Sequence, residues 1–150
     1  MVDDRQIVVF KLAQEHYGLP IDQVREINRL SEITKLPQTP SFMEGIVNLR
    51  GKIIPIVDLR KRFGLAVHNT EDTRIVVVDL AEHTVGIIVD DVTEVMHLAT
   101  DNIEAVPSSF IMDAEYLDGL GKFENRLIIL LKLEKILNSQ EQDILNYPLQ

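Results

Sequence analysis

Short runs of β-branched residues recur along this chain, and polar turns separate them. Residues 7–12 and 17–21 form the first pair of runs, and residues 75–80 and 85–89 form a second pair. Runs of this length and composition are typical of strands, and two of them around a short polar turn predict a β-hairpin. The pattern therefore predicts two hairpins built on the same plan.

The two hairpins belong to a longer internal repeat. The stretch QIVVFKLAQEHYGLPIDQVREINRL, which starts at Gln6, aligns without a gap on RIVVVDLAEHTVGIIVDDVTEVMHL, which starts at Arg74, at an offset of 68 residues (74 − 6). A later stretch, 53–59, matches 127–133 at an offset of 74 residues (127 − 53). Similarity at a fixed spacing indicates one supersecondary unit that is used twice.

Each half of the chain offers about five short strands and few helices. Five short strands cannot bury both faces as an open sheet, whereas closure into a small barrel removes the exposed edges. We therefore predict an all-β protein with a few short helices, in which two similar five-stranded barrels pack together. Residues 1–150 would form a single domain, with 6–64 and 74–137 as the barrels and 138–150 as a short C-terminal helix and tail.

Capping signals mark the few helical turns that we expect. Asp22 and Asp90, at equivalent positions of the repeat, each precede a short stretch in which apolar residues recur three apart. An aspartate in this position is a favourable N-cap, so each is predicted to cap a helical turn. The tetrapeptides SFME at 41–44 and SQEQ at 139–142 fit the capping box that opens a helix.

One basic cluster, Arg60-Lys61-Arg62, lies between Asp58 and Gly64. Aspartate is a common N-cap and glycine commonly follows the last helical residue, so the cluster is predicted to form a helical turn. We interpret its charged side chains as a solvated helix face.

Composition restricts the class of function. The 150-residue chain carries a formal net charge of −9, which repels phosphate backbones and makes nucleic acid a poor partner. It has no cysteine, so disulfides, thiolate catalysis and zinc–thiolate sites are excluded, and a reducing cytoplasm is the natural setting. No apolar run approaches the roughly 18 residues of a membrane span, and the first residues lack the layout of a secretory signal. We expect a soluble, cytoplasmic protein without direct membrane insertion.

Catalytic and metal-binding patterns are missing from the sequence. The histidines His16 and His83 fall in the predicted hairpin turns, and neither they nor His68 and His97 have the spacing of a helical metal pair. No nucleophile elbow, phosphate loop or dinucleotide fingerprint occurs. We therefore expect no enzyme, no metal site and no cofactor. What remains is a binding module, whose many Val and Ile residues either face a partner or fill a core shared by the barrels.

Four longer stretches, together with the repeat, resemble the CheW family of coupling proteins in bacterial chemotaxis. The stretches are YGLPIDQVREI, EGIVNLRGKIIPIVDLRKRFG, VGIIVDDVTEV, and YLDGLG followed by LIILLKLEKIL, and the resemblance covers residues 5–145. It implies two five-stranded, SH3-like barrels around a shared hydrophobic core, without catalysis. It also implies an adaptor, monomeric when free, that bridges a methyl-accepting chemoreceptor to the regulatory domain of the histidine kinase CheA in arrays at the inner face of the membrane.

The resemblance assigns roles to individual positions. The receptor tip, an antiparallel helical hairpin, would lie in a hydrophobic groove where the two lobes meet. Gly45 and Phe110 would be kinase-side positions, and Glu104 and Ser109 depart from the charge pattern of that edge. The receptor-side positions are Val24, Glu26, Ile27, Asn48, Leu49, Arg50, Gly51, Ile87 and Val89.

Arg50 stands beside Gly51, in a turn where Asn or Asp is usual. Its charge complements that of Glu26, so we predict that the two residues form an ion pair that borders the groove. An arginine that only ties down its own turn is the alternative. Two further functions stay open: an adaptor of a related non-flagellar array, such as one for twitching motility, and an orphan barrel that binds a small ligand or an oligonucleotide.

Overall fold

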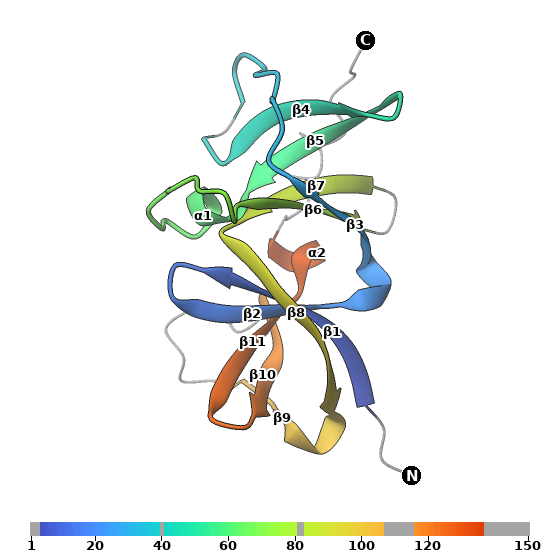
Figure 1. Cartoon of the computed structure of the whole chain (residues 1–150), viewed down its shortest axis with the longest axis vertical. Helices are drawn as coiled ribbons and strands as arrows, with labels where there is room; N and C mark the ends of the chain where they lie inside the picture. Colours follow the sequence, from blue (N-terminus) through green and yellow to red (C-terminus); the bar gives the residue numbers. More distant parts are fainter. Residues whose placement is uncertain (1–3, 40, 81–82, 107–115, 137–150) are drawn as a thin grey trace.

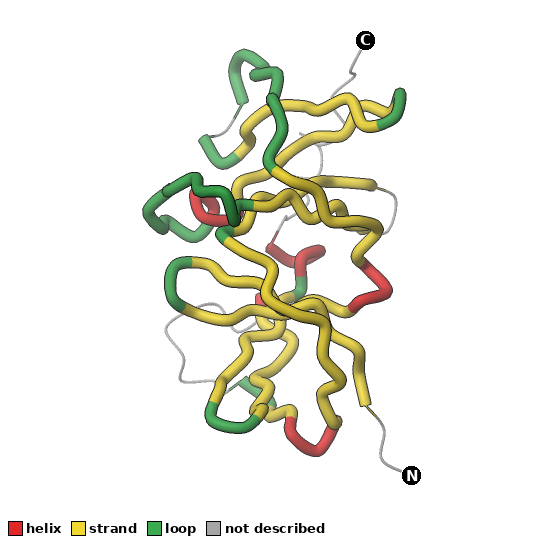
Figure 2. The backbone as a smooth tube through the Cα atoms, viewed as in Figure 1, coloured by secondary structure: helices red, strands yellow, loops and turns green. Residues whose placement is uncertain are grey.

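The computed structural model describes residues 4–39, 41–80, 83–106 and 116–136. Most of this part of the chain is β-structure (Figures 1 and 2), which confirms the predicted class of a β-protein with short helices. In chain order the elements are β1 (Asp4–Leu12), β2 (Glu15–Pro20), the 3-10 helix η1 (Ile21–Gln23), β3 (Val24–Arg29), β4 (Met43–Leu49), β5 (Lys52–Asp58), α1 (Leu59–Arg62), β6 (Arg74–Leu80), β7 (His83–Val89), β8 (Asp91–Ala99), the 3-10 helix η2 (Thr100–Asn102), β9 (Ile103–Glu104), β10 (Leu117–Phe123), β11 (Arg126–Leu131) and α2 (Leu133–Ile136).

The strands form two sheets. One has six strands in the order β8-β1-β2-β11-β10-β9, and the other has five in the order β3-β6-β7-β5-β4. Each sheet with its connections forms a lobe. In Figure 1 the five-stranded lobe is the upper one and the six-stranded lobe is the lower one. The two predicted hairpins are present, because β1 pairs with β2 and β6 pairs with β7, both antiparallel.

The sheets divide the chain differently from the prediction. Strand β3 pairs with β6, and β8 pairs with β1, so the third strand of each repeat crosses to the hairpin of the other repeat. Residues 24–89 therefore supply the five-stranded sheet, and 4–20 with 91–131 supply the other, in place of the expected 6–64 and 74–137. Equivalent strands of a repeat have the same alternation of inward and outward residues. The sequence pattern is therefore equally compatible with strand pairing within a repeat and with strand pairing between repeats, and it cannot distinguish the two.

Each sheet curls around its own hydrophobic cluster, and a third cluster is shared between the lobes. Strand β6 shows how one strand serves two clusters. Ile75 and Val77 face the interior of the five-stranded lobe, whereas Val76 and Val78 face the shared cluster. Because both faces of such strands are buried, they read as continuous β-branched runs. The shared hydrophobic core expected from the resemblance is confirmed.

Few of the many Val and Ile residues remain for a partner. The large apolar side chains that stay exposed in the described part of the chain are Ile27, Ile53, Val67, Val95 and Leu127. Ile27 and Val95 are equivalent in the repeat, as are Ile53 and Leu127. The core thus accounts for most β-branched residues, and four of the five exposed apolar residues form two pairs that are equivalent in the repeat.

Helix α1 lies where the sequence predicts it. The Asp58 carboxylate caps it by accepting a hydrogen bond from the Arg60 N–H at 3.0 Å. The predictions that Asp22 and Asp90 cap helical turns are wrong. Asp22 lies inside η1 and makes no capping hydrogen bond, and Asp90 separates β7 from β8 with no helical turn after it. In both repeats the residues that follow continue as a strand, because cross-strand pairing satisfies their backbone groups.

The capping box at 41–44 does not open a helix. Strand β4 begins at Met43, and the Phe42 carbonyl accepts a hydrogen bond from the Asp58 N–H at 2.8 Å. Pairing with β5 outweighs the local preference for a cap, as tertiary context often does. The box at 139–142 and the expected segment 138–150 lie outside the described residues.

Candidate partner-binding site

The β4–β5 hairpin ends in a two-residue turn formed by Arg50 and Gly51. Their φ angles are both positive, 53° and 85°, which is the combination that defines a type I′ turn. Glycine adopts this conformation readily, whereas arginine does so rarely. The Asn48 side-chain oxygen supports the turn by accepting a hydrogen bond from the Gly51 N–H at 2.9 Å. The turn therefore holds Arg50 at a defined place at the end of the lobe.

Arg50 pairs with Glu26, which confirms the predicted ion pair. Glu26 lies on β3, and β3 and β4 are the opposite edge strands of the five-stranded sheet. The pair therefore joins two edges of a curled sheet. Asn28 also donates a hydrogen bond to Glu26, at 2.8 Å. The Glu26 side chain is only 17% exposed while that of Arg50 is 73% exposed, so the arginine is the member offered to a partner.

The six-stranded lobe holds a related ion pair that the sequence pattern did not predict, although its arginine aligns with Lys52 and not with Arg50 at the offset of 74 residues. Arg126, the first residue of β11, pairs with Glu94, which is the repeat equivalent of Glu26. The Arg126 guanidinium also lies 5.4 Å from the centre of the Phe123 ring. The identity of Glu26 and Glu94 in the aligned repeats was the signal that could have indicated this pair.

An apolar cleft of about 260 Å³ opens beside the Glu26–Arg50 pair. Buried side chains of the five-stranded lobe line it together with the polar residues that support the pair and its turn. A volume of this order accommodates one bulky apolar side chain, since an engineered cavity of roughly 150 Å³ already holds benzene. The residues that line the cleft are Asn28, Arg29, Ser31, Val47, Asn48, Leu49, Ile54, Ile56, Ile75 and Val77.

The structure brings only some predicted receptor-side positions together. Asn48, Leu49, Arg50 and Gly51 lie at one hairpin tip, and the ion pair adds Glu26 to them. Ile27, the next residue of β3, points to the opposite face of the strand and is 39% exposed.

Three other predicted positions face the shared core. Val24 packs against it and is half-buried. Ile87 and Val89 are completely buried in it. Their side chains do not line a groove at the surface, because β7 is a central strand with both faces covered.

The two predicted kinase-side positions have different outcomes. Gly45 is buried, and a Cβ atom placed on it would lie 2.0 Å from the Thr34 carbonyl oxygen. Backbone hydrogen bonds between Thr34 and Ile46, at 2.8 and 2.9 Å, hold these segments together. Gly45 is therefore a position of close backbone approach and offers no side chain to a partner. Phe110 and the neighbouring Ser109 lie outside the described residues, and Glu104 is paired with Lys122 at 2.7 Å.

The interpretation of Arg60 as part of a solvated face is wrong. Its side chain is 1% exposed and forms ion pairs with Asp58 and Asp90. Burial lowers the pKa of Arg60, but the hydrogen bonds and charges of Asp58 and Asp90 outweigh burial, so the pKa lies above its ordinary value. No pattern in the sequence marks one arginine of a basic cluster as buried.

The described part of the chain offers no cluster of metal-ligating side chains. Within it, no group of three or more His, Asp or Glu side chains is arranged to hold a metal ion. His16 and His83, expected in turns, lie in β2 and β7. No helix among the described residues is long and apolar enough to cross a membrane.

The exposed arginine on a fixed turn and the adjacent apolar cleft suit a protein that binds other proteins. A model of the CheW-like domain family matches residues 6–141. The chain therefore belongs to the CheW family, whose members are non-catalytic scaffolding adaptors of chemotaxis. This membership favours the adaptor over the orphan ligand-binding barrel.

Individual relatives support the assignment. The chain is 37% identical over 144 residues to chemotaxis protein CheW of Klebsiella aerogenes, covering 95% of this chain and 87% of the relative. It is 34% identical to chemotaxis protein CheW of Helicobacter pylori, covering 88% of this chain and 81% of the relative. The crystal structure of the scaffolding protein TtCheW from Thermoanaerobacter tengcongensis superposes with a TM-score of 0.85 at 41% identity, covering 93% of this chain and 91% of that chain.

Proposed function

We propose that this chain couples the cytoplasmic tip of a methyl-accepting chemoreceptor to the regulatory domain of the histidine kinase CheA. The coupling takes place in arrays at the inner face of the membrane. Outside these arrays, the free protein is a monomer. Membership of the CheW family supports the coupling role. The observation that carries the site is the ion pair of Glu26 with the exposed Arg50, next to an apolar cleft.

The receptor helices lie along β3 and the tip of the β4–β5 hairpin. Ile27 supplies an exposed apolar contact, and the cleft beside Leu49 takes one apolar side chain of the receptor. Arg50 provides the polar edge. An apolar centre with a polar rim is the usual anatomy of a protein interface. Phe110 is the proposed aromatic contact to the kinase.

Capture of the two partners tests this function. The immobilised chain is expected to retain both a receptor cytoplasmic fragment and the CheA regulatory domain. Ile27→Asp should lose the receptor fragment, because a charge replaces an exposed apolar contact that the proposal assigns to the receptor. Val95→Asp is the matched control, since Val95 is the repeat equivalent of Ile27 on the other lobe and is 52% exposed.

Two outcomes contradict the proposal. Capture of neither partner by the unmodified chain would overturn the coupling role. Receptor capture at full strength by a folded Ile27→Asp variant would place the receptor site on another part of the surface.

A further inference from the structure

The described chain passes between the lobes at two places, and these differ in how they are held. The first crossing is η1, which leads from β2 to β3. No side-chain hydrogen bond caps its start. The second crossing is the single residue Asp90, which separates β7 of the five-stranded lobe from β8 of the six-stranded lobe. Asp90, in contrast, is fixed by several polar contacts.

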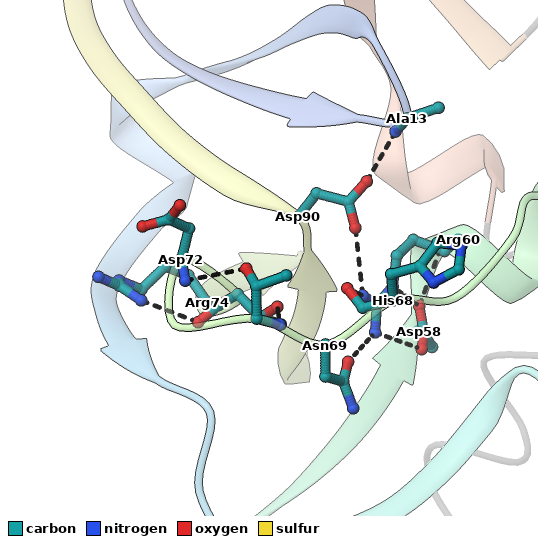
Figure 3. A network of polar contacts seen from close by, with 10 residues as sticks. Ala13, Asp58, Arg60, His68, Asn69, Asp72, Arg74 and Asp90 are labelled. Carbon is teal, nitrogen blue, oxygen red and sulfur yellow. Dashed lines mark hydrogen bonds and ion pairs between the residues drawn. The ribbon is translucent and has the colours of Figure 1, made fainter.

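The Asp90 carboxylate contacts both lobes, one with each oxygen (Figure 3). Oδ2 accepts a hydrogen bond from the Ala13 N–H at 2.7 Å, in the β1–β2 turn of the six-stranded lobe. Oδ1 accepts from Arg60 Nη1 at 3.1 Å, on helix α1 of the five-stranded lobe. The Asp90 N–H also donates to the Lys11 carbonyl at 3.0 Å. A single side chain thus bridges the lobes at the point where the chain crosses.

Arg60 makes this bridge rigid. Its guanidinium forms a two-pronged contact with Asp58 at 3.0 and 3.1 Å and reaches the His68 carbonyl and the Asn69 side chain at 3.2 and 2.8 Å. With Asp90, every N–H group of the side chain has an acceptor. A buried guanidinium that is fully hydrogen-bonded has one low-energy orientation, because any rotation leaves a buried donor unpaired. Asp90 is therefore held against α1 in one position.

The same helix reaches the six-stranded lobe a second time. Arg62 Nη2 donates to the Ile136 carbonyl of α2 at 2.9 Å. Its guanidinium also lies 5.8 Å from the ring of Phe42 and 5.8 Å from that of Tyr116, aromatic residues of different lobes at equivalent positions of the repeat. Helix α1 consequently contacts Asp90 through Arg60 and the six-stranded lobe through Arg62, and these contacts stabilise one side of the interface between the lobes.

We propose that Asp90, held by Arg60, sets the angle between the two lobes and thereby positions the partner-binding edge. The first part concerns the free protein. The second part rests on the proposed function and on the groove between the lobes that the family resemblance implies for the receptor, because β3 and the Arg50 turn themselves lie on the five-stranded lobe. Asp90 and Arg60 are positioning residues and need no contact with the receptor.

Distance measurements between the lobes test the first part. The chain has no cysteine, so Lys52→Cys and Asn125→Cys, at the exposed hairpin tips of the two lobes, accept spin labels selectively. In this labelled background, Asp90→Ala is expected to broaden the distribution of label distances. Asp90→Asn, which keeps an oxygen for Ala13 but loses the charge that faces Arg60, should broaden it less. If Asp90→Ala does not fold, the label distances are measured in Asp90→Asn instead.

Asp79→Ala is the matched control. Asp79 accepts from Arg25 at 3.1 Å and from the Thr84 hydroxyl at 2.9 Å, all within the five-stranded lobe. Its loss removes an equally paired carboxylate and is expected to leave the distance distribution unchanged. A folded Asp90 variant with a distribution as narrow as that of the parent would overturn the first part, and so would equal broadening by Asp79→Ala.

Receptor capture tests the second part. If only about a tenth of the Asp90→Ala molecules hold the competent angle, the apparent affinity for the receptor fragment falls about tenfold. A broadened distance distribution with unchanged capture would overturn the positioning role and leave the angle-setting role standing. Failure of the unmodified chain to capture the fragment would instead overturn the proposed function, and the distance measurement would still decide the first part.

Discussion

Arg50 and Glu26 join the two edge strands of the five-stranded sheet, from a turn at one edge to a strand at the other. The pair is unequal, because the glutamate is mostly buried and held by Asn28 while the arginine is mostly exposed. One residue pair therefore serves the closure of the sheet and leaves a positive charge at the surface.

Removal of the Arg50 side chain should affect binding more than stability. Water screens this pair because the Arg50 side chain is 73% exposed, and exposed pairs contribute only about 0–1 kcal/mol to the free energy of unfolding. Arg50→Ala is therefore expected to change thermal unfolding little and to weaken receptor capture, with loss of kinase activation in a reconstituted array. Glu26→Ala should have the same effect, and the double variant should lose less than the sum of the two. Arg126→Ala, which breaks the ion pair of Glu94 in the other lobe, is the control and should retain capture. Strictly additive losses of binding would show that Arg50 and Glu26 act independently.

Arg60→Met should destabilise the protein strongly. The substitution leaves the buried Asp58 without its ion-pair partner and removes the partner of Asp90. Breaking a buried ion pair from one side costs about 3–5 kcal/mol. Lys61→Met is the control, because Lys61 is the next residue of α1 and its side chain is partly exposed, although it pairs with Glu44. Denaturant unfolding measures both, and equal stabilities of the two variants would contradict a buried role for Arg60.

Gly45→Ala should cost more stability than Gly51→Ala. Both glycines have positive φ, 145° and 85°, so both substitutions strain the backbone, by roughly 1–2 kcal/mol. Only at Gly45 does the added Cβ meet backbone, at 2.0 Å from the Thr34 oxygen, whereas nothing lies within 4 Å at Gly51. Hydrogen exchange of the Thr34 and Ile46 amides should accelerate in Gly45→Ala alone. Similar costs for the two variants would show that the close approach is relieved without loss.

We expect the protein to lose stability at high pH, because the Tyr17 side chain ionises there. Burial, and secondly the charge of Glu15, raise the pKa of Tyr17 above its ordinary value of 10.0. Because the folded pKa exceeds the unfolded one, the neutral side chain contributes stability that is complete below the unfolded pKa. This contribution is lost as the pH rises through the folded pKa. Tyr17 stacks between Phe10 and Phe63, so Tyr17→Phe keeps the apolar packing and removes the titrating group. Unfolding free energies measured across pH 10 should fall less steeply in Tyr17→Phe, and identical slopes would contradict the prediction.

Several features could be predicted from the sequence because they depend on neighbouring residues or on the repeat. The two hairpins and the β-rich class follow from β-branched runs around polar turns, and Asp58 caps α1 through residues two positions away. The Glu26–Arg50 pair was predicted from complementary charges in two short motifs. The family was recognised from long stretches of sequence, and a match over residues 6–141 confirms it.

Other features were decided only by the tertiary structure. The exchange of β3 and β8 between repeats buries the same alternating faces as pairing within each repeat, so the sequence pattern carries no signal for it. Arg60 is buried because Asp90, 30 residues later, crosses between the lobes beside it, and no local pattern reveals such a partner. Ile87 and Val89 follow the apolar pattern of a surface wall equally well, but a shared core between the lobes covers them. Residues 41–44 have the local sequence of a capping box, but they pair with β5 instead. The hydrogen bond that Phe42 accepts comes from Asp58, which lies outside the four residues of the box.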